Sequence, residues 1–195
     1  FGDGRRTEIV ESGEEIIAED TIKPEDVAVT VTHAGYIKRI SVDAYRQQRR
    51  GGKGIIAATT RDGDFVESIF VANTHSYILF FTNMGIVHWL KVYGVPEASR
   101  YASGKAIVNL LQLRENEKIN AFIPVREFTG NLVMVTRNGT IKKTELSEYS
   151  NPRRGGIIGI TLEDNDELIT VAATSGGQQL IVATANGLAV RFNEQ

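Results

Sequence analysis

The feature that most constrains the fold of this chain is a repeat of about fifty residues. In each copy, an apolar run rich in β-branched or aromatic residues leads to a turn that ends in glycine, and a second short strand follows. The four copies are Val29–Lys38, Leu79–His88, Val133–Lys142 and Ile181–Val190. Self-similarity at a period of about 20 to 50 residues is typical of solenoids and propellers, so the repeat indicates a chain built from similar units.

The turn glycines fix the phase of the repeat. They are Gly35, Gly85, Gly139 and Gly187, separated by 50, 54 and 48 residues. Asn83-Met-Gly85, Asn138-Gly139 and Asn186-Gly187 offer residues that tolerate positive φ, which tight two-residue hairpin turns need. The sequence therefore predicts a hairpin with a two-residue turn in each copy.

Other features keep the same phase and complete each unit. A small-residue loop follows the hairpin in the first three copies, at Gly51-Gly-Lys53, Ser103-Gly-Lys105 and Gly155-Gly156. After it come a short apolar strand and an acidic turn, at Asp62-Gly-Asp64, Glu115-Asn-Glu117 and Asp164-Asn-Asp166. A further apolar strand closes the unit, at 65–71, 118–123 and 167–171. Four strands per repeat are typical of a propeller blade, so we expect an all-β, propeller-like fold of four-stranded blades.

The chain divides into an acidic lead-in, residues 1–26, and a repeat domain, residues 27–195. The lead-in carries nine acidic and three basic residues, whereas the rest of the chain has a net charge of +4. Pro24 marks the boundary, and we expect segment 11–23 to be a strand or a linker. Three repeats are complete and the fourth stops after its hairpin, which leaves an open sheet edge. We therefore expect a truncated domain whose natural chain continues, with a front end cut before Phe1.

Composition excludes several kinds of site. The chain has no cysteine, which removes disulfides, thiolate zinc sites and cysteine nucleophiles. No apolar run of about 18 residues is present to span a bilayer. We expect a cytoplasmic protein.

The segment Gln47–Gly54 is the strongest chemical signal. Its last six residues, Arg49–Gly54, hold three cations and three glycines, so the loop offers positive charge and exposed backbone N–H groups to a polyanion. Taken alone, the segment could equally be a solvated flexible loop. Basic residues recur in phase with it, however, and a stripe of charge along one edge tracks a phosphate backbone. The candidate DNA-binding residues are Gln48, Arg49, Arg50, Gly51, Gly52, Lys53, Gly54, Lys38, Arg39, Arg46, Arg100, Lys105, Lys142, Lys143, Arg153, Arg154 and Arg191.

Other motifs favour structural roles. Gly52–Ala57 matches a loose dinucleotide-binding pattern but precedes a β-rich stretch rather than a helix. The histidines His33, His75 and His88 lack ligand-like spacing, and the acidic turns lack the rest of a calcium loop. Trp89 is near enough to Lys91 to suggest stacking on bases, yet packing in the core is the favoured role.

The loop Gln48-Arg-Arg-Gly-Gly-Lys-Gly54 resembles the heptapeptide box of the DNA gyrase A family. The resemblance extends over the whole chain, from Phe1–Ile9 through 71–75, 91–93, 96–100 and 107–111 to 138–144. It implies a β-pinwheel, a propeller-like disc, usually of six blades, in which neighbouring blades exchange a strand. It also implies that Gln48–Gly54 fastens the first blade to the last and contacts DNA, while Arg100–Ala106 and Pro152–Ile158 are degenerate copies of the box.

The resemblance further implies a function. Arg49, Arg50 and Lys53, with the in-phase cations, would bind duplex DNA without reading its sequence and wrap it for ATP-dependent negative supercoiling by a type II topoisomerase. The partners would be DNA, the N-terminal domain of gyrase A and the gyrase B protein, in an A2B2 assembly that uses ATP and Mg²⁺. This chain would itself hold no catalytic residue, cofactor or metal. The alternatives are the C-terminal domain of topoisomerase IV, whose box is degraded, and a protein-binding β-propeller scaffold.

Overall fold

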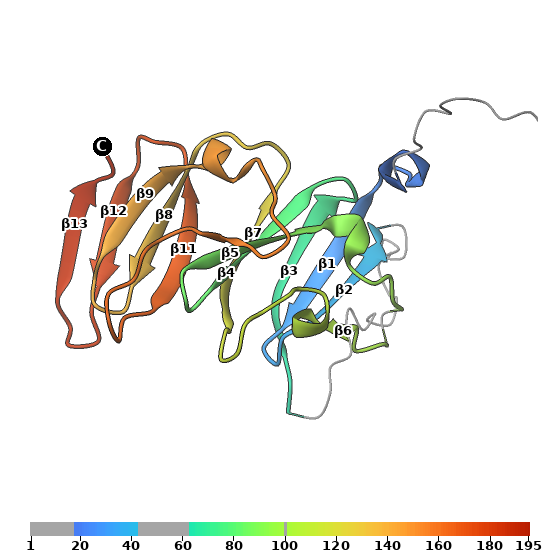
Figure 1. The fold of residues 1–195 in the computed structure, drawn as a ribbon, viewed down its shortest axis with the longest axis horizontal. Helices are drawn as coiled ribbons and strands as arrows, with labels where there is room; N and C mark the ends of the chain where they lie inside the picture. The colour runs from blue at the N-terminus through green and yellow to red at the C-terminus, as the bar shows by residue number, and fades with distance from the viewer. Residues whose placement is uncertain (1–17, 43–62, 100) are drawn as a thin grey trace, which may run out of the picture.

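The computed structural model describes residues 18–42, 63–99 and 101–195, and its named strands all pair antiparallel (Figure 1). Blade 1 contains β1 (Asp26–Thr32), β2 (Tyr36–Ser41), β3 (Val66–Asn73) and β6 (Lys105–Ala106). Blade 2 contains β4 (Tyr77–Thr82), β5 (Ile86–Lys91), β7 (Ile119–Val125) and β10 (Ile157–Ile158). Blade 3 contains β8 (Asn131–Thr136), β9 (Ile141–Glu145) and β11 (Leu168–Thr174), and blade 4 contains β12 (Gln179–Ala183) and β13 (Ala189–Asn193). The all-β fold of propeller-like blades is confirmed.

Two short strands leave their own repeat. β6 follows the hairpin of blade 2 but pairs with β2 of blade 1, and β10 follows the hairpin of blade 3 but pairs with β5 of blade 2. The sheet orders are therefore β3-β1-β2-β6 and β10-β5-β4-β7. The strand exchange implied by the resemblance is present. Each complete blade consists of three strands of its own and one from the next repeat.

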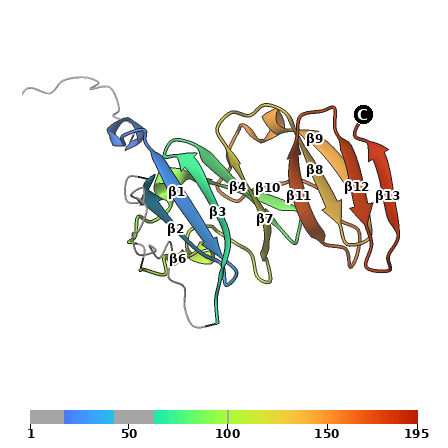
Figure 2. The same cartoon turned by 180° about the vertical axis from the view of Figure 1, so that it is seen from behind.

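The blades pack face to face through two apolar cores. In β4, Ile78 and Phe80 face the core shared with blade 1, whereas Leu79 and Phe81 face the core shared with blade 3. All four side chains are fully buried. Successive side chains of a strand point to opposite faces, so one uninterrupted apolar run supplies both cores. Figure 2, the view from behind, shows blades 1 to 4 following one another across the molecule.

The hairpins lie where the sequence predicts them, but the prediction of a two-residue turn is wrong. In each turn the glycine N–H donates to the carbonyl of the threonine three residues earlier, at 2.9, 2.9, 3.1 and 3.0 Å for Thr32, Thr82, Thr136 and Thr184. The glycine alone has positive φ, because Asn138 and Asn186 are not among the left-handed residues. Such a turn, followed by a left-handed glycine, is the geometry of a longer hairpin loop with a bulge.

Four 3₁₀ helices complete the described chain: η1 (Ala18–Thr21), η3 (Val92–Gly94), η4 (Ile107–Asn109) and η5 (Leu146–Tyr149). η1 lies in the lead-in and is tied to blade 2, because Lys91 Nζ donates to Glu19 Oε1 at 2.7 Å. The expected strand or linker over 11–23 is therefore a 3₁₀ turn in its described part. None of the helices in the described ranges is long and apolar enough to cross a membrane.

Candidate nucleic-acid interface

The blades have an inner and an outer edge. At the inner edge, the ring centroids of Phe70 in β3 and Phe122 in β7 lie 5.7 Å apart, which joins blades 1 and 2. The side-chain amide of Asn120 in β7 donates to the carbonyl of Leu168 in β11, which joins blades 2 and 3. β6 and β10 lie at the opposite edge of their sheets. The segments that lead into them, 101–104 and 150–156, are called the rim loops below. They occupy the same phase of the repeat as Gln48–Gly54.

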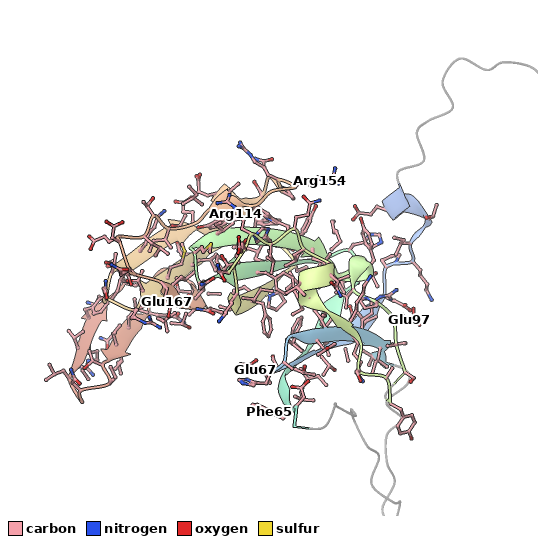
Figure 3. The ribbon with its side chains drawn as sticks, turned by 60° about the horizontal axis from the view of Figure 1, so that its bottom comes forward. Phe65, Glu67, Glu97, Arg114, Arg154 and Glu167 are labelled. Atoms are coloured by element: carbon pink, nitrogen blue, oxygen red, sulfur yellow. The ribbon has the colours of Figure 1, made fainter. Side chains whose placement is uncertain are left out.

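The rim loop of blade 3 exposes two free cations. Arg153 and Arg154 are exposed, and neither guanidinium has a hydrogen bond or an ion pair with another described residue. The N–H of Gly156 donates to the carbonyl of Arg153 at 3.0 Å, so both arginines lie in one tight turn. Figure 3 shows Arg154 at the surface, away from the sheets. Unpaired guanidiniums on an exposed turn are well suited to bind phosphate oxygens.

A glycine fastens each described rim loop to the neighbouring blade. Gly104 and Gly156 both have positive φ, of 83° and 72°. A Cβ atom on Gly104 would meet the carbonyl oxygen of Ile37 at 2.4 Å, and one on Gly156 would meet that of Val87 at 2.9 Å. These close approaches bring the loop onto β2 or β5. Lys105, directly after Gly104, is exposed and has no side-chain partner in the described ranges.

Lys38 lies in the interior rather than at the outer surface. Its side chain is 2% exposed, and its ammonium donates to the carbonyls of Ser99 and Ala102 at 3.4 and 2.7 Å. Burial lowers the pKa of Lys38. This lysine holds the rim loop from beneath and cannot reach DNA in this conformation.

Three further candidates bind main-chain carbonyls. Arg39 Nε donates to Val95 at 2.9 Å, and its guanidinium also lies 3.3 Å from Glu97. Lys142 Nζ donates to Gly159 and Lys143 Nζ to Glu194, at 2.7 and 2.8 Å. These cations are engaged within the protein, unlike those of the rim loop.

The remaining candidates divide into two groups. Arg191 on β13 is exposed and has no partner in the described part of the chain. Gln48, Arg49, Arg50, Gly51, Gly52, Lys53 and Gly54, together with Arg46 and Arg100, lie outside the described residues. Those nine positions stay predictions.

The hairpin turns gather at one end of the blades, the turn end (Figure 1), where Asp64, Glu117 and Asp166 bond the turn residues. Asp166 accepts hydrogen bonds from the N–H groups of Asn138 and Glu167 at 3.0 and 2.8 Å. Desolvation raises the pKa of Asp166, but hydrogen bonds from Thr136 and the backbone outweigh it and lower the pKa. The acidic turns thus clamp the hairpin turns, which explains their spacing.

The threonine of each turn was not predicted from the sequence. Thr32, Thr82, Thr136 and Thr184 each accept, at Oγ1, the N–H of the residue after the turn glycine, at 3.2, 3.3, 3.1 and 3.2 Å. In the first three blades a carboxylate also bonds this hydroxyl: Asp64, Glu117 and Asp166 respectively. A threonine three residues before every turn glycine was the available signal.

The aromatic and histidine side chains have structural roles. His33 stacks on Phe65, His75 bonds the carbonyl of Ile22, and His88 is buried with its Nε2 2.8 Å from Glu117. Trp89 packs against the core between blades 2 and 3 and donates to the carbonyl of Tyr149 at 2.8 Å. The predicted packing role of Trp89 is confirmed.

Comparison with solved structures finds the same architecture. The chain is similar to the C-terminal domain of DNA topoisomerase IV, with a TM-score of 0.76 and 34% identity over 89% of this chain and 53% of that one. It is also similar to the DNA gyrase A C-terminal domain, with a TM-score of 0.60 and 26% identity over 88% of this chain and 55% of that one. The E. coli ParC C-terminal domain, at 16% identity, a TM-score of 0.69 and coverage of 86% and 64%, shares the fold.

Sequence comparison supplies the family. The chain is 52% identical to the DNA gyrase A protein of Clostridium acetobutylicum and 48% identical to that of Escherichia coli K12, in each case over its whole length. It spans 24% and 22% of those two proteins. The model of the DNA gyrase C-terminal domain, beta-propeller, matches residues 26–73, 76–126, 130–175 and 178–195. The chain therefore belongs to the DNA gyrase C-terminal domain family.

Proposed function

We propose that this chain binds duplex DNA along the rim loops without reading its sequence, and bends the duplex as the wrapping module of a DNA gyrase. The observation that carries the proposal is the loop with Arg153 and Arg154, whose two exposed guanidiniums have no partner in the described chain. This loop occupies the phase of Gln48–Gly54, where three more cations lie. Loops from successive blades present charge at intervals along one edge, as a phosphate backbone requires.

Bending follows from the arrangement of the blades. The rim loops stand on successive blades that follow one another across the molecule (Figure 1). We expect a duplex that touches several of them to curve, as the disc-like arrangement of blades in the family implies. Bending 20 to 30 base pairs by tens of degrees costs roughly 1–6 kcal/mol, which contacts between phosphates and cations can offset. The acidic turn end favours the rim over the turns as the path of DNA, because like charges repel phosphate.

In the whole enzyme, the chain would present a DNA segment for strand passage. The cleavage tyrosine, the metal carboxylates and the ATPase would lie in other parts of an A2B2 assembly that uses ATP and Mg²⁺ in the cytoplasm. The chain would then contribute DNA geometry and no catalytic group. Negative supercoiling would depend on the right-handed wrap that the gyrase family implies.

A topoisomerase IV assignment is the second candidate, because the C-terminal domain of that enzyme has the TM-score of 0.76. The intact segment Gln48–Gly54 favours gyrase. The two assignments differ in outcome. An enzyme that carries this chain as its C-terminal domain should introduce negative supercoils into relaxed plasmid with ATP as a gyrase, and only relax or decatenate DNA as a topoisomerase IV.

The experiment measures duplex affinity against salt for several unrelated sequences. We expect a steep slope for the wild type, because log K falls by about 0.9 per log unit of salt for each phosphate that is neutralised. Arg153→Ala/Arg154→Ala should make the slope shallower by about 1.8 if each arginine binds one phosphate. Arg49→Ala/Arg50→Ala/Lys53→Ala should likewise make it shallower.

The control removes equal charge from the turn end. Arg114 and Lys118 are exposed and lie there, because the carbonyl of Lys118 accepts the N–H of Asn83 and that of Arg114 the N–H of Glu117. Arg114→Ala/Lys118→Ala should leave the slope close to that of the wild type. A control that lowers the slope as much as the arginine variant would move the DNA path to the turn end. A folded wild type that binds no duplex at low salt would favour the protein-binding scaffold.

A further inference from the structure

One position in the repeat donates a hydrogen bond to a main-chain carbonyl of the next repeat through three different groups. It lies four residues after the turn glycine and is occupied by Arg39, Trp89, Lys143 and Arg191. Arg39 Nε donates to the carbonyl of Val95 at 2.9 Å, Trp89 Nε1 to that of Tyr149 at 2.8 Å, and Lys143 Nζ to that of Glu194 at 2.8 Å. A guanidinium, an indole and an ammonium share little except a long side chain that ends in an N–H donor. Val95 and Tyr149 each lie ten residues after the next turn glycine, whereas Glu194 lies seven residues after it. The feature that the three side chains share is a donor that reaches a main-chain carbonyl of the next blade, rather than the charge.

The carbonyl that accepts from Trp89 lies at the start of a rim loop. Tyr149 ends η5, and the loop with Arg153 and Arg154 begins directly after it. The far end of the same loop pairs with β5, where Ile157 lies opposite Val87. Both ends of the rim loop are therefore fastened to β5 of blade 2, one by the indole of Trp89 and the other by the sheet.

Trp89 also lies beneath the arginines. It lines a hollow of about 300 Å³ together with His88, Pro152, Arg153 and Arg154. Its ring packs against the core between blades 2 and 3, which fixes the indole in place. On this side the arginine turn borders the hollow, and the bond from Trp89 to the carbonyl of Tyr149 fastens the start of the loop to blade 2.

We infer that Trp89 is a positioning residue for the arginine loop. Through the carbonyl of Tyr149 it fixes where Arg153 and Arg154 stand relative to the other rim loops, and so it determines how sharply bound DNA is bent. The number of phosphates that the loop neutralises does not depend on it, because the guanidiniums remain. The inference rests on the proposed function, since it concerns DNA at the rim.

The test separates bending from binding in the 195-residue chain. Trp89→Phe keeps an aromatic ring and removes the N–H donor. Fluorophores at the two ends of a duplex of about 30 base pairs report the bend at saturating protein, by energy transfer. We expect less energy transfer for Trp89→Phe than for the wild type, and a salt slope equal to that of the wild type within about 0.5. Trp89→Arg, which supplies the donor that Arg39 uses in blade 1, should restore the energy transfer.

The same experiment carries its own controls. Arg153→Ala/Arg154→Ala should lower the salt slope, which Trp89→Phe should not. If Trp89 were important only for the stability of the fold, Trp89→Phe would lower the melting temperature and leave the energy transfer of the saturated complex unchanged. That result would overturn the inference and leave the proposed function standing. A wild type that does not bind the duplex would instead overturn the proposed function.

The unaltered protein offers a second readout. Trp89 is the only tryptophan of the chain, so its emission reports on this contact alone. Duplex DNA should change the emission of the wild type and leave that of Arg153→Ala/Arg154→Ala unchanged, because the arginines connect the phosphates to the indole. An emission that bound DNA does not alter would contradict the inference, even if Trp89→Phe failed to fold.

Discussion

Among single residues, the turn threonines and their carboxylates make the same hydrogen bonds in successive blades. The hydroxyl of Thr82 is fully buried; it accepts the N–H of Ile86 and bonds the carboxylate of Glu117. Glu117 also accepts the N–H of Arg114 at 2.6 Å and lies 2.8 Å from His88. A buried carboxylate needs such a set of partners, because an unpaired charge in the interior is costly.

This arrangement predicts how stability depends on pH. Burial acts to raise the pKa of Glu117, but the bonds from Arg114, His88 and Thr82 outweigh it, so the pKa lies below its ordinary value of 4.5. A lowered pKa gives stability that is complete above the unfolded value and is lost as the pH falls through the folded value. We expect the urea midpoint of the wild type to fall as the pH drops below about 4.5.

The matched pair is Glu117→Gln and Glu115→Gln. The first should lower the midpoint at neutral pH and flatten its dependence on acid, because the charge that gives rise to the dependence is gone. The second changes an exposed carboxylate two residues away and should follow the wild type. Equal acid dependence in both variants would contradict the account of Glu117.

At the scale of elements, the exchanged strands are short and depend on the glycines before them. β6 and β10 have two residues each, so backbone pairing alone holds them weakly. Gly104 and Gly156 bring the chain against β2 and β5 at distances that no side chain permits. The backbone contacts of these glycines therefore hold the rim loops against the neighbouring blade, without any contribution from the charged side chains.

The adjacent glycines Gly155 and Gly156 provide the test. A Cβ on Gly156 would meet Ile86, Val87 and His88 at 2.8, 2.9 and 3.0 Å, and the residue has a φ of 72°. Gly156→Ala should lower the free energy of unfolding by roughly 1–3 kcal/mol, because a left-handed alanine is strained. Gly155→Ala meets nothing within 4 Å and should be nearly neutral. Urea unfolding of the two variants checks this, and equal losses would refute it.

The sequence predicts the elements better than their partners. The regularly spaced turn glycines predicted the positions of all four hairpins, because a tight turn depends on the residues within it. β6 has only two residues, Lys105 and Ala106, and the periodicity of two residues cannot predict which sheet they join. Lys38 and Arg39 are adjacent cations whose side chains leave opposite faces of a strand, so the sequence could not show that both are engaged inside the protein.

At the scale of the whole molecule, charge is sorted by position. The rim loops expose Arg153 and Arg154, whereas Asp64, Glu117 and Asp166 are drawn into the turn end to hold the hairpins. A net charge of −2 for the whole chain conceals this division. From this division we expect duplex DNA to follow the rim and avoid the turn end.

The most direct measurement uses the absence of cysteine from the chain. Three single variants would each carry a tethered iron chelate that cuts nearby DNA. Ser99→Cys lies next to one rim loop, Asn151→Cys lies in the other, and Glu163→Cys lies at the turn end. All three positions are exposed. We expect cuts in an end-labelled duplex from both rim positions, at different distances from its end, and none from Glu163→Cys. Cutting from Glu163→Cys with none from the rim positions would contradict it.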